Sequence, residues 1–288
     1  MLALRTLALL GLLFVSCSST QERAPGVRRA VYVLEVELER ARAIRWAPKD
    51  ATDEQVLESA AGIVRRRLAA MERSFQVRTG LEGRRIELAM PQIQPRDREL
   101  FEDMLRSLGS CELLFLADEE LVRPFGVDLE AERKKLETWR ASNVTLPLEV
   151  FNSLPAEQQG PHPRILWLEA DLAGKVGPLQ AMLLPDKPED HVGVGSFERI
   201  YLTQDSFDHP GLGFELKPSR VDDFARLTEA HVHHRLGFVL EGKLRSALTL
   251  ETKLIGGGVF EGDFKAMEID RLTESIWKHA TPLRVEIR

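Results

Sequence analysis

The chain has 288 residues, of which 43% are hydrophobic and 29% are charged, so it is long enough to bury an ordinary globular core in one or two domains. Its formal net charge is -6 at pH 7, from 39 basic and 45 acidic side chains. Because binding to nucleic-acid phosphates requires clustered Lys and Arg, this composition argues against RNA or DNA as a partner.

The N-terminal residues predict an export signal that ends in a lipid anchor. Arg5 precedes an apolar run over 7–15, and this run is shorter than the roughly 20 residues that cross a bilayer. The sequence Phe-Val-Ser-Cys at 14–17 resembles the lipobox of bacterial lipoproteins. An ordinary signal peptide or an uncleaved anchor is the alternative. We expect a signal peptide over 1–16, lipidation of Cys17, a polar tether over 17–27, and a chain held to the membrane by its N-terminal lipid that faces the periplasm or the extracellular side of the cell envelope.

The segment over 28–117 has the pattern of a ferredoxin-like β-α-β-β-α-β unit. Thr52 and Gln55 form a capping box, and apolar residues then recur every three to four positions, which predicts a helix over 52–71. Arg65, Arg66 and Arg67 lie on its other face and indicate a solvated surface, with contact to acidic lipid or to a partner as the alternative. The remaining predicted elements are strands over 31–38, 75–78, 85–89 and 111–116 and a helix over 95–108.

The segment over 118–197 is less regular. A charged helix is expected over 128–141, and prolines interrupt the rest around a predicted strand over 164–169. A long connection inside a compact domain is often functional. An insertion without a function is the alternative.

Regular patterns return over 198–264. Pro218 and Ser219 open a predicted helix whose apolar stripe continues to Leu236, and Gly237 is expected to end it. A strand over 238–240, a turn at Glu241-Gly242 and a strand over 244–254 then predict a hairpin. A glycine loop and a short strand reach Phe264, and the last elements are a helix over 269–280 and a strand over 283–287.

The order of motifs in this last region resembles the large periplasmic domain of SecD, the accessory subunit of the Sec protein-export machinery. The motifs are Phe214-x-Leu216, Phe224-x-x-Leu227-Thr228, Val232, Arg235-Leu236, Gly242-Lys243, Ser246-Ala247, Gly256-Gly257 and Gly262-x-Phe264. The resemblance implies an α+β fold with a ferredoxin-like base over 28–117 and 265–288, and an inserted α+β head over 118–264 whose SecD-like core is 198–264. Two departures are clear: the Asp-Leu-x-Gly-Gly signature of SecD is replaced by Pro-Gly-Val-Arg-Arg-Ala at 25–30, and Leu248 stands where SecD has proline.

The search for catalytic or metal-binding groups gives little. His231 and His234 would lie about 60° apart on a helix and could share a ligand, but no carboxylate has the spacing of a zinc hydrolase, so they are weak metal candidates beside an ordinary surface role. Gly256, Gly257 and Gly258 lack the Lys-Ser/Thr of a phosphate loop. We expect no enzymatic activity and no cofactor.

The sequence therefore predicts a lipid-anchored, extracytoplasmic SecD-like domain that binds polypeptide or Sec components and passively assists protein export. Its expected partners are components of the Sec translocon or exported polypeptides. The residues predicted to contact them are Phe207, Phe214, Trp139 and Arg235. The alternative is a structural or small-ligand-binding envelope lipoprotein that shares only the fold.

Overall fold

The structure is a computed structural model of the chain. It describes residues 29–43, 50–71, 74–80, 84–94, 98, 100–102, 104–105, 111–142, 162–172, 175–204, 210–262, 264–267, 269–270, 273 and 283–287. Cys17, the signal peptide and the tether predicted before residue 28 lie outside these residues, as does Phe207. No helix in the described part of the chain is both long enough and apolar enough to cross a membrane.

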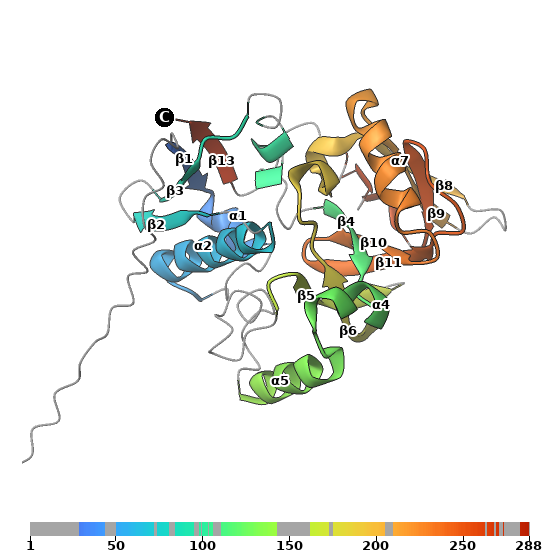
Figure 1. Cartoon of the computed structure of the whole chain (residues 1–288), viewed down its shortest axis with the longest axis horizontal. Helices are drawn as coiled ribbons and strands as arrows, with labels where there is room; N and C mark the ends of the chain where they lie inside the picture. The colour runs from blue at the N-terminus through green and yellow to red at the C-terminus, as the bar shows by residue number, and fades with distance from the viewer. Residues whose placement is uncertain are drawn as a thin grey trace, which may run out of the picture.

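One part of the molecule is a four-stranded antiparallel sheet covered by a long helix (Figure 1). The sheet order is β13-β1-β3-β2, and the capping box predicted at the start of helix α2 is confirmed, with Thr52 and Gln55 each bonding the other's backbone N–H. Apolar side chains of α2, β1 and β3 share one core with Phe101, Met104 and Leu105. The bounds are β1 Arg29–Val36, α1 Leu38–Ala43, α2 Asp53–Ala70, β2 Gln76–Gly80, β3 Arg85–Pro91 and β13 Leu283–Ile287.

The predicted strand over 111–116 exists as β4 (Cys111–Leu116), but its assignment to the four-stranded sheet is wrong. Strand β4 pairs antiparallel with β10 on one side and with β6 and β7 on the other. All six of its residues are buried, and its alternate side chains enter two different cores. A strand buried on both faces must be covered on both faces. The four-stranded sheet is covered by a helix on one side and so offers no such place.

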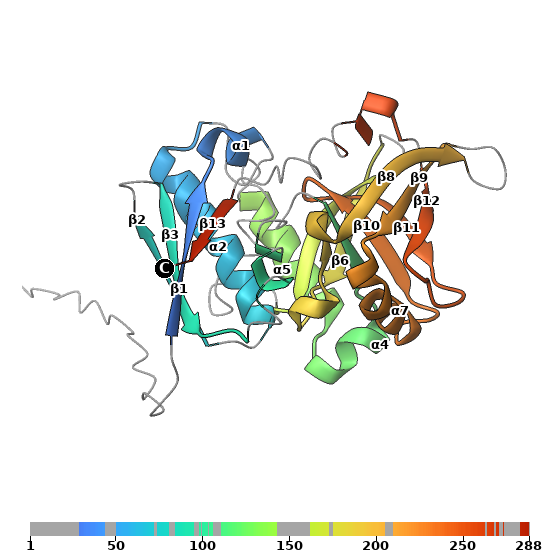
Figure 2. The same cartoon turned by 90° about the horizontal axis from the view of Figure 1, so that it is seen from above.

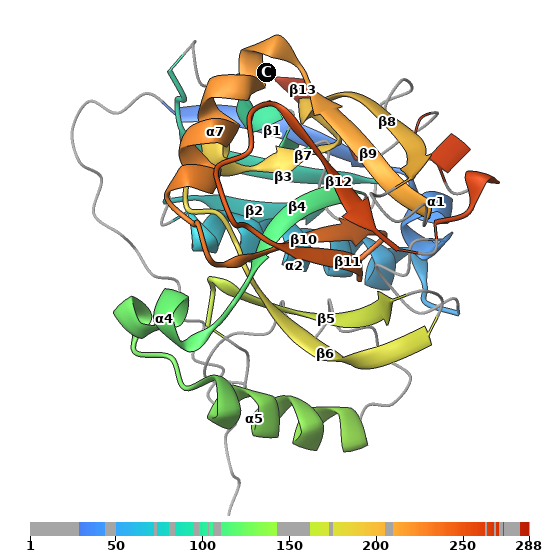
Figure 3. The same cartoon turned by 90° about the vertical axis from the view of Figure 1, so that its right-hand side faces the viewer.

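Five strands close into a ring, in the order β4, β10, β11, β5, β6 and back to β4 (Figure 3). Side chains from all five meet in one cluster that includes Leu116, Leu166, Met182, Val239 and Leu244. The ring is therefore filled by side chains. The further bounds are β5 Ile165–Leu172, β6 Lys175–Leu183, β7 Val192–Gly193, β10 Arg235–Leu240 and β11 Lys243–Thr249.

The region over 118–197 is more regular than expected. It forms α4 (Glu119–Val122), η1 (Arg123–Phe125) and α5 (Leu129–Ser142), together with two strands of the ring, η3 (Pro188–Asp190) and η4 (Val194–Ser196). The predicted strand over 164–169 is confirmed as β5, whereas β6 was missed because Gly177 and Pro178 interrupt its apolar pattern. This region therefore builds the ring.

A three-stranded sheet, β12-β9-β8, packs beside the ring with helix α7. Its core is aromatic: the rings of Phe214 and Phe224 lie 6.0 Å apart, and those of Phe214 and Phe260 lie 5.6 Å apart. The bounds are β8 Phe197–Gln204, β9 Pro210–Leu216, η5 Pro218–Arg220, α7 Val221–Glu229 and β12 Gly257–Glu261.

Helix α7 is shorter than predicted, and Gly237 does not cap it. The helix ends at Glu229, and no side chain caps its start. His233 then takes a left-handed conformation (φ 74°) and donates its backbone N–H to Leu250 O at 2.7 Å, which turns the chain into β10. Gly237 lies inside that strand, where a Cβ would be 2.7 Å from Leu244 Cδ1. The predicted Glu241-Gly242 turn is confirmed, with positive φ at both residues.

Candidate functional site

An apolar pocket of about 270 Å³ opens where β4 and β6 meet the end of α7. Leu121 of α4 and Phe125 of η1 form a further wall, and the loop after β6 forms the rim. Most of its lining is aliphatic or aromatic, with a few charged groups at the edge. The lining residues are Leu113, Leu114, Phe115, Leu121, Phe125, Arg164, Leu183, Leu184, Pro185, Asp186, Asp190, Leu227 and His231.

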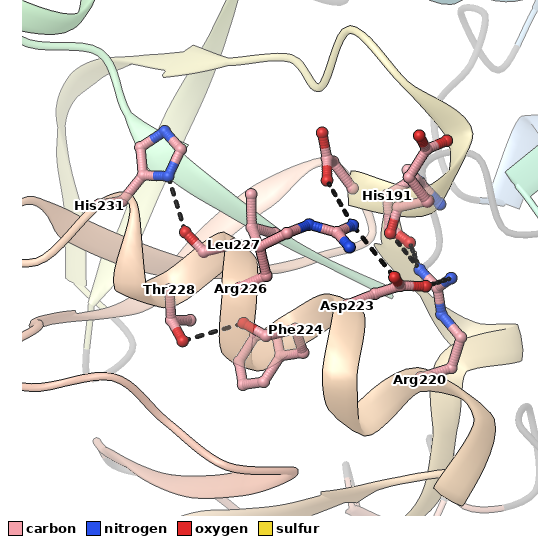
Figure 4. Close-up of polar contacts among 10 residues, drawn as sticks. His191, Arg220, Asp223, Phe224, Arg226, Leu227, Thr228 and His231 are labelled. Carbon is pink, nitrogen blue, oxygen red and sulfur yellow. Dashed lines mark hydrogen bonds and ion pairs between the residues drawn. The ribbon is translucent and has the colours of Figure 1, made fainter.

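His231 forms a fixed part of this lining. Its ring stacks on Phe115 with centroids 4.2 Å apart and planes 19° apart. Its Nδ1 lies 2.8 Å from the carbonyl oxygen of Leu227, so Nδ1 carries the proton and donates to it (Figure 4). The stacking and the hydrogen bond hold the imidazole against the pocket.

Arg164 is committed to the structure of the rim. Its guanidinium lies 5.2 Å from the ring centre of Phe125, its Nε donates to Leu184 O at 2.8 Å, and its Nη1 is 3.4 Å from Asp186 Oδ2. Arginine suits this place because its planar fork can stack on a ring and donate in several directions at once. The positive charge of Arg164 is thus largely compensated by groups of the protein itself.

Arg220 fixes the loop that carries the acidic part of the rim. It is buried, and its Nη2 donates to the carbonyl oxygens of Glu189 at 2.8 Å and His191 at 2.7 Å (Figure 4). Its Nη1 lies 3.3 Å from Asp223 Oδ2 on α7. One side chain therefore ties the loop before β7 to the first turn of α7.

Asp190 is only partly neutralised by the protein. Its side chain is 18% exposed, and Arg226 Nη2 lies 3.9 Å from Asp190 Oδ1 but 3.0 Å from Asp223 Oδ1. Burial raises the pKa of the Asp190 carboxyl, and the negative charges of Asp186 and Glu189 raise it further. A carboxylate with incomplete compensation thus borders an apolar pocket.

A buried ion pair joins the two parts of the molecule just behind this loop. Arg67 Nη2 on α2 lies 3.0 Å from Glu112 Oε2 on β4, and the two side chains are 4% and 0% exposed. His191 Nε2 lies 3.4 Å from the other oxygen of Glu112. Figure 2 shows α2 between the four-stranded sheet and the ring. A chain of contacts therefore runs from α2 to the pocket loop.

This junction corrects the expectation that Arg65, Arg66 and Arg67 form a solvated face. Only Arg65 lies at the surface, where it pairs with Glu58. Arg66 and Arg67 are buried, and Arg66 donates to the carbonyl oxygen of His162. Arg67 is covered where it pairs with Glu112 of β4, and Arg66 is covered where it meets the backbone just before β5.

Among the described residues predicted to contact a partner, Phe214 and Trp139 do not lie together. Phe214 is 1% exposed inside the aromatic core, so its assignment as a contact residue is wrong for the folded protein. Trp139 is half-buried on α5, and Arg235 is exposed at the start of β10. Helix α5 and strand β9, which carries Phe214, lie at different ends of this part of the molecule (Figures 1 and 3).

Each of the two histidines that were weak metal candidates is bonded to a protein group. The rings of His231 and His234 lie 6.1 Å apart, but His234 Nδ1 is 2.8 Å from Asp118 Oδ2 and His231 is held by a carbonyl oxygen. Among the described residues, no group of three His, Cys, Asp or Glu side chains could hold an ion. Burial alone would raise the pKa of Asp118, but the Leu121 N–H and His234 outweigh burial and lower it.

Sequence patterns do not identify most residues of the pocket, because these residues fall in the region expected to be irregular. The available signal was the apolar stretch that ends at Leu184, followed at once by the charged residues 186–190. An apolar strand end beside a charged loop is a common composition for the edge of a binding site. Only the structure shows that Leu121, Phe125 and Leu227 close the same space.

Comparison with known proteins finds partial matches. No protein-family model matches the chain. It is 29% identical over 93 residues to the protein translocase subunit SecD of Sebaldella termitidis, a match that covers 32% of this chain and 23% of that protein. SecD of Leptotrichia buccalis is 28% identical over 87 residues (30% and 22% of the two chains), and SecD of Aquifex aeolicus is 34% identical over 68 residues (24% and 14%). The matches span less than a quarter of the length of these relatives.

Two solved structures also align with the chain. A crystal structure of SecDF in its super-membrane-facing form aligns over 90% of this chain and 30% of that one, with 19% identity and a TM-score of 0.35. A SecDF structure described as a membrane component that enhances protein export aligns over 90% and 99%, with 17% identity and a TM-score of 0.35. The sequence matches, with the ordered motifs from Phe214 to Phe264, support a SecD-like domain in this chain.

Proposed function

We propose that this chain is an extracytoplasmic SecD-like domain that holds apolar segments of polypeptide in the pocket at the end of the ring, and so passively assists protein export. The observation that carries the proposal is the pocket itself: a space of about 270 Å³ with an apolar lining and a charged rim. Apolar side chains of an unfolded polypeptide lose contact with water on entering such a space, and this favours binding. The sequence matches to SecD supply the link to export.

The walls of the pocket suit holding rather than catalysis. His231 is held by stacking and by the Leu227 carbonyl, and Arg164 and Arg220 are engaged with protein groups. A preformed wall reduces the ordering cost of binding. We assign no chemical step to the chain.

Two further assignments belong to the same proposal. The four-stranded sheet with α2 would be the ferredoxin-like base, with β13 in place of the strand over 111–116 as its last strand; the all-antiparallel order β13-β1-β3-β2 supports this. Lipidation of Cys17 would hold the domain at the membrane. Cys17→Ala should abolish incorporation of labelled lipid and shift the chain out of the membrane fraction, and unchanged mass and fractionation would refute the anchor.

Crosslinking in living cells tests the proposed function. A photoreactive amino acid at Leu121, in the pocket, should give adducts with exported polypeptides or Sec subunits. The same amino acid at Asp222, exposed on α7, is the matched control. Adducts of equal yield at both positions, or none at Leu121, would refute the proposal.

A small apolar ligand is the second candidate, because the pocket is close to the lower end of the roughly 300–1,000 Å³ range of small-molecule sites. This is the case of an envelope lipoprotein that shares only the fold. A thermal-shift screen with cell-wall fragments and amphiphiles would favour it if one compound raised Tm strongly. A screen without any such compound would leave polypeptide as the ligand class.

A further inference from the structure

The rim of the pocket carries an unequal distribution of charge. On the side of Arg164, the positive charge is shared among a ring, a carbonyl oxygen and Asp186. On the side of α7, Asp190 borders the apolar lining with Asp186 and Glu189 close enough to affect its charge. The negative charge of the Asp190 carboxylate is therefore only partly neutralised, and a cationic group of a ligand would be attracted to it.

Among the described residues, two cations act on Asp190: Lys187, three positions earlier in the same loop, and Arg226 on α7. Arg226 forms an ion pair with Asp190 but lies closer to another group. Arg226 Nη2 is 3.9 Å from Asp190 but 3.0 Å from Asp223, and its side chain is 62% exposed. An exposed pair at 3.9 Å is weak because water and salt screen it. A basic group of a ligand can therefore approach Asp190 without breaking a strong contact.

We propose that the pocket selects polypeptide segments in which a Lys or Arg adjoins a large apolar residue, with the apolar side chain in the pocket and the cationic group on the Asp190 carboxylate. This inference rests on the proposed function and names the sequence class that the site prefers. An acidic neighbour is disfavoured because it would meet Asp186, Glu189 and Asp190. A neutral neighbour gains the apolar contact alone.

The expected size of the preference follows from the partial burial of Asp190. A charge-assisted hydrogen bond at a site that is 18% exposed is stronger than one at a fully exposed surface pair. We expect a Lys-containing peptide to bind about tenfold more tightly than the same peptide with an uncharged residue of equal length. The difference should shrink as salt concentration rises.

Peptide binding to the full chain tests this inference. Fluorescence anisotropy would compare three labelled hexapeptides, Gly-Ser-Phe-Leu-X-Gly, in which X is Lys, norleucine or Glu. The native chain should prefer Lys over norleucine about tenfold, and Glu should bind most weakly. Asp190→Asn should bind the Lys and norleucine peptides equally, whereas the matched control Asp222→Asn, on the exposed face of α7, should keep the preference.

The outcomes distinguish failure of the charge preference from failure of the proposed function. Equal binding of the Lys and norleucine peptides to the native chain would overturn the charge preference and leave polypeptide holding in place. A Lys preference that persists in Asp190→Asn would also overturn it, provided that circular dichroism shows the variant folded. Failure of all three peptides to bind would overturn both.

Discussion

The four-stranded sheet and the ring bury their residues in different ways. The sheet and α2 share a core made of apolar side chains, and three of its strands come from residues 29–91. The ring draws its strands from residues 111–249 and has buried polar or charged side chains at its boundary, among them Glu112, His191 and Arg220. Burial of charge is costly unless each group is paired. The first region is therefore a scaffold, whereas the second maintains a charged junction beside a pocket.

The largest effect should come from breaking the buried ion pair of the junction. Glu112→Ala leaves the Arg67 guanidinium buried without its partner, and we expect a loss of about 3–5 kcal/mol in the free energy of unfolding. Urea unfolding followed by circular dichroism measures it. Glu58→Ala, which removes the exposed partner of Arg65, is the control and should cost less than about 1 kcal/mol.

The double variant Arg67→Met with Glu112→Leu tests whether an unpaired buried charge causes this loss of stability. Removing both charges relieves the uncompensated burial, so the double variant should recover most of the stability lost by Glu112→Ala. If the double variant is no more stable than Glu112→Ala, the ion pair is not the reason for the loss.

The next effect tests the close packing inside the ring. In Gly237→Ala, the new Cβ would lie 2.7 Å from Leu244 Cδ1 and 2.8 Å from Met182 Cε, so overpacking should cost about 1–3 kcal/mol. Gly80→Ala, on edge strand β2 where no atom lies within 4 Å of the new Cβ, should be nearly neutral. Equal shifts of Tm in the two variants would contradict the described packing.

A smaller effect is expected at the cap of α4. Asp118 Oδ1 accepts the Leu121 N–H at 2.9 Å, so Asp118→Ala should cost about 1 kcal/mol at neutral pH. Because the folded-state pKa of Asp118 is lowered, its contribution is present above the ordinary Asp pKa of about 4 and is lost as the pH falls through the lower folded value. The difference between the native chain and the variant should therefore narrow in acid. A difference that stays constant from pH 7 down to acid unfolding would contradict this assignment.

The smallest predicted effect is a gain in stability, caused by a substitution at Asp190. The folded-state pKa of Asp190 is raised, so protonation stabilises the fold, and this stability is lost as the pH rises through the raised value. Asn resembles the protonated acid, and Asp190→Asn should raise Tm by about 1–2 °C at pH 7. Scanning calorimetry measures the shift, and the gain should disappear below pH 4. A lower Tm at pH 7 would show that the carboxylate is well compensated.

Local sequence patterns predict most of the helices, strands and turns, but few of the pairings between strands. Thr52 and Gln55 define the start of α2, and Glu241-Gly242 defines a turn, because both signals lie within four residues. The placement of β4 depends on β10 and β6, whose paired residues lie 66 or more positions later, and no local period reveals it.

The candidate site was harder to predict for the same reason. Arg67 is buried only because it pairs with Glu112, 45 positions away. The run of three arginines by itself therefore predicts a solvent-exposed face. Phe214 lies within a motif that carries the SecD resemblance, and its aromatic neighbours explain its presence there without any contact to a partner.

The most direct test of the central claim is to fill the pocket. Leu227→Trp places a larger side chain in the lining, and Asp222→Trp, on the exposed face of the same helix, is the control. The affinity for the Lys-containing peptide should fall at least about tenfold in Leu227→Trp and should change little in Asp222→Trp. Unchanged peptide affinity in a folded Leu227→Trp protein would contradict the claim that this pocket holds polypeptide.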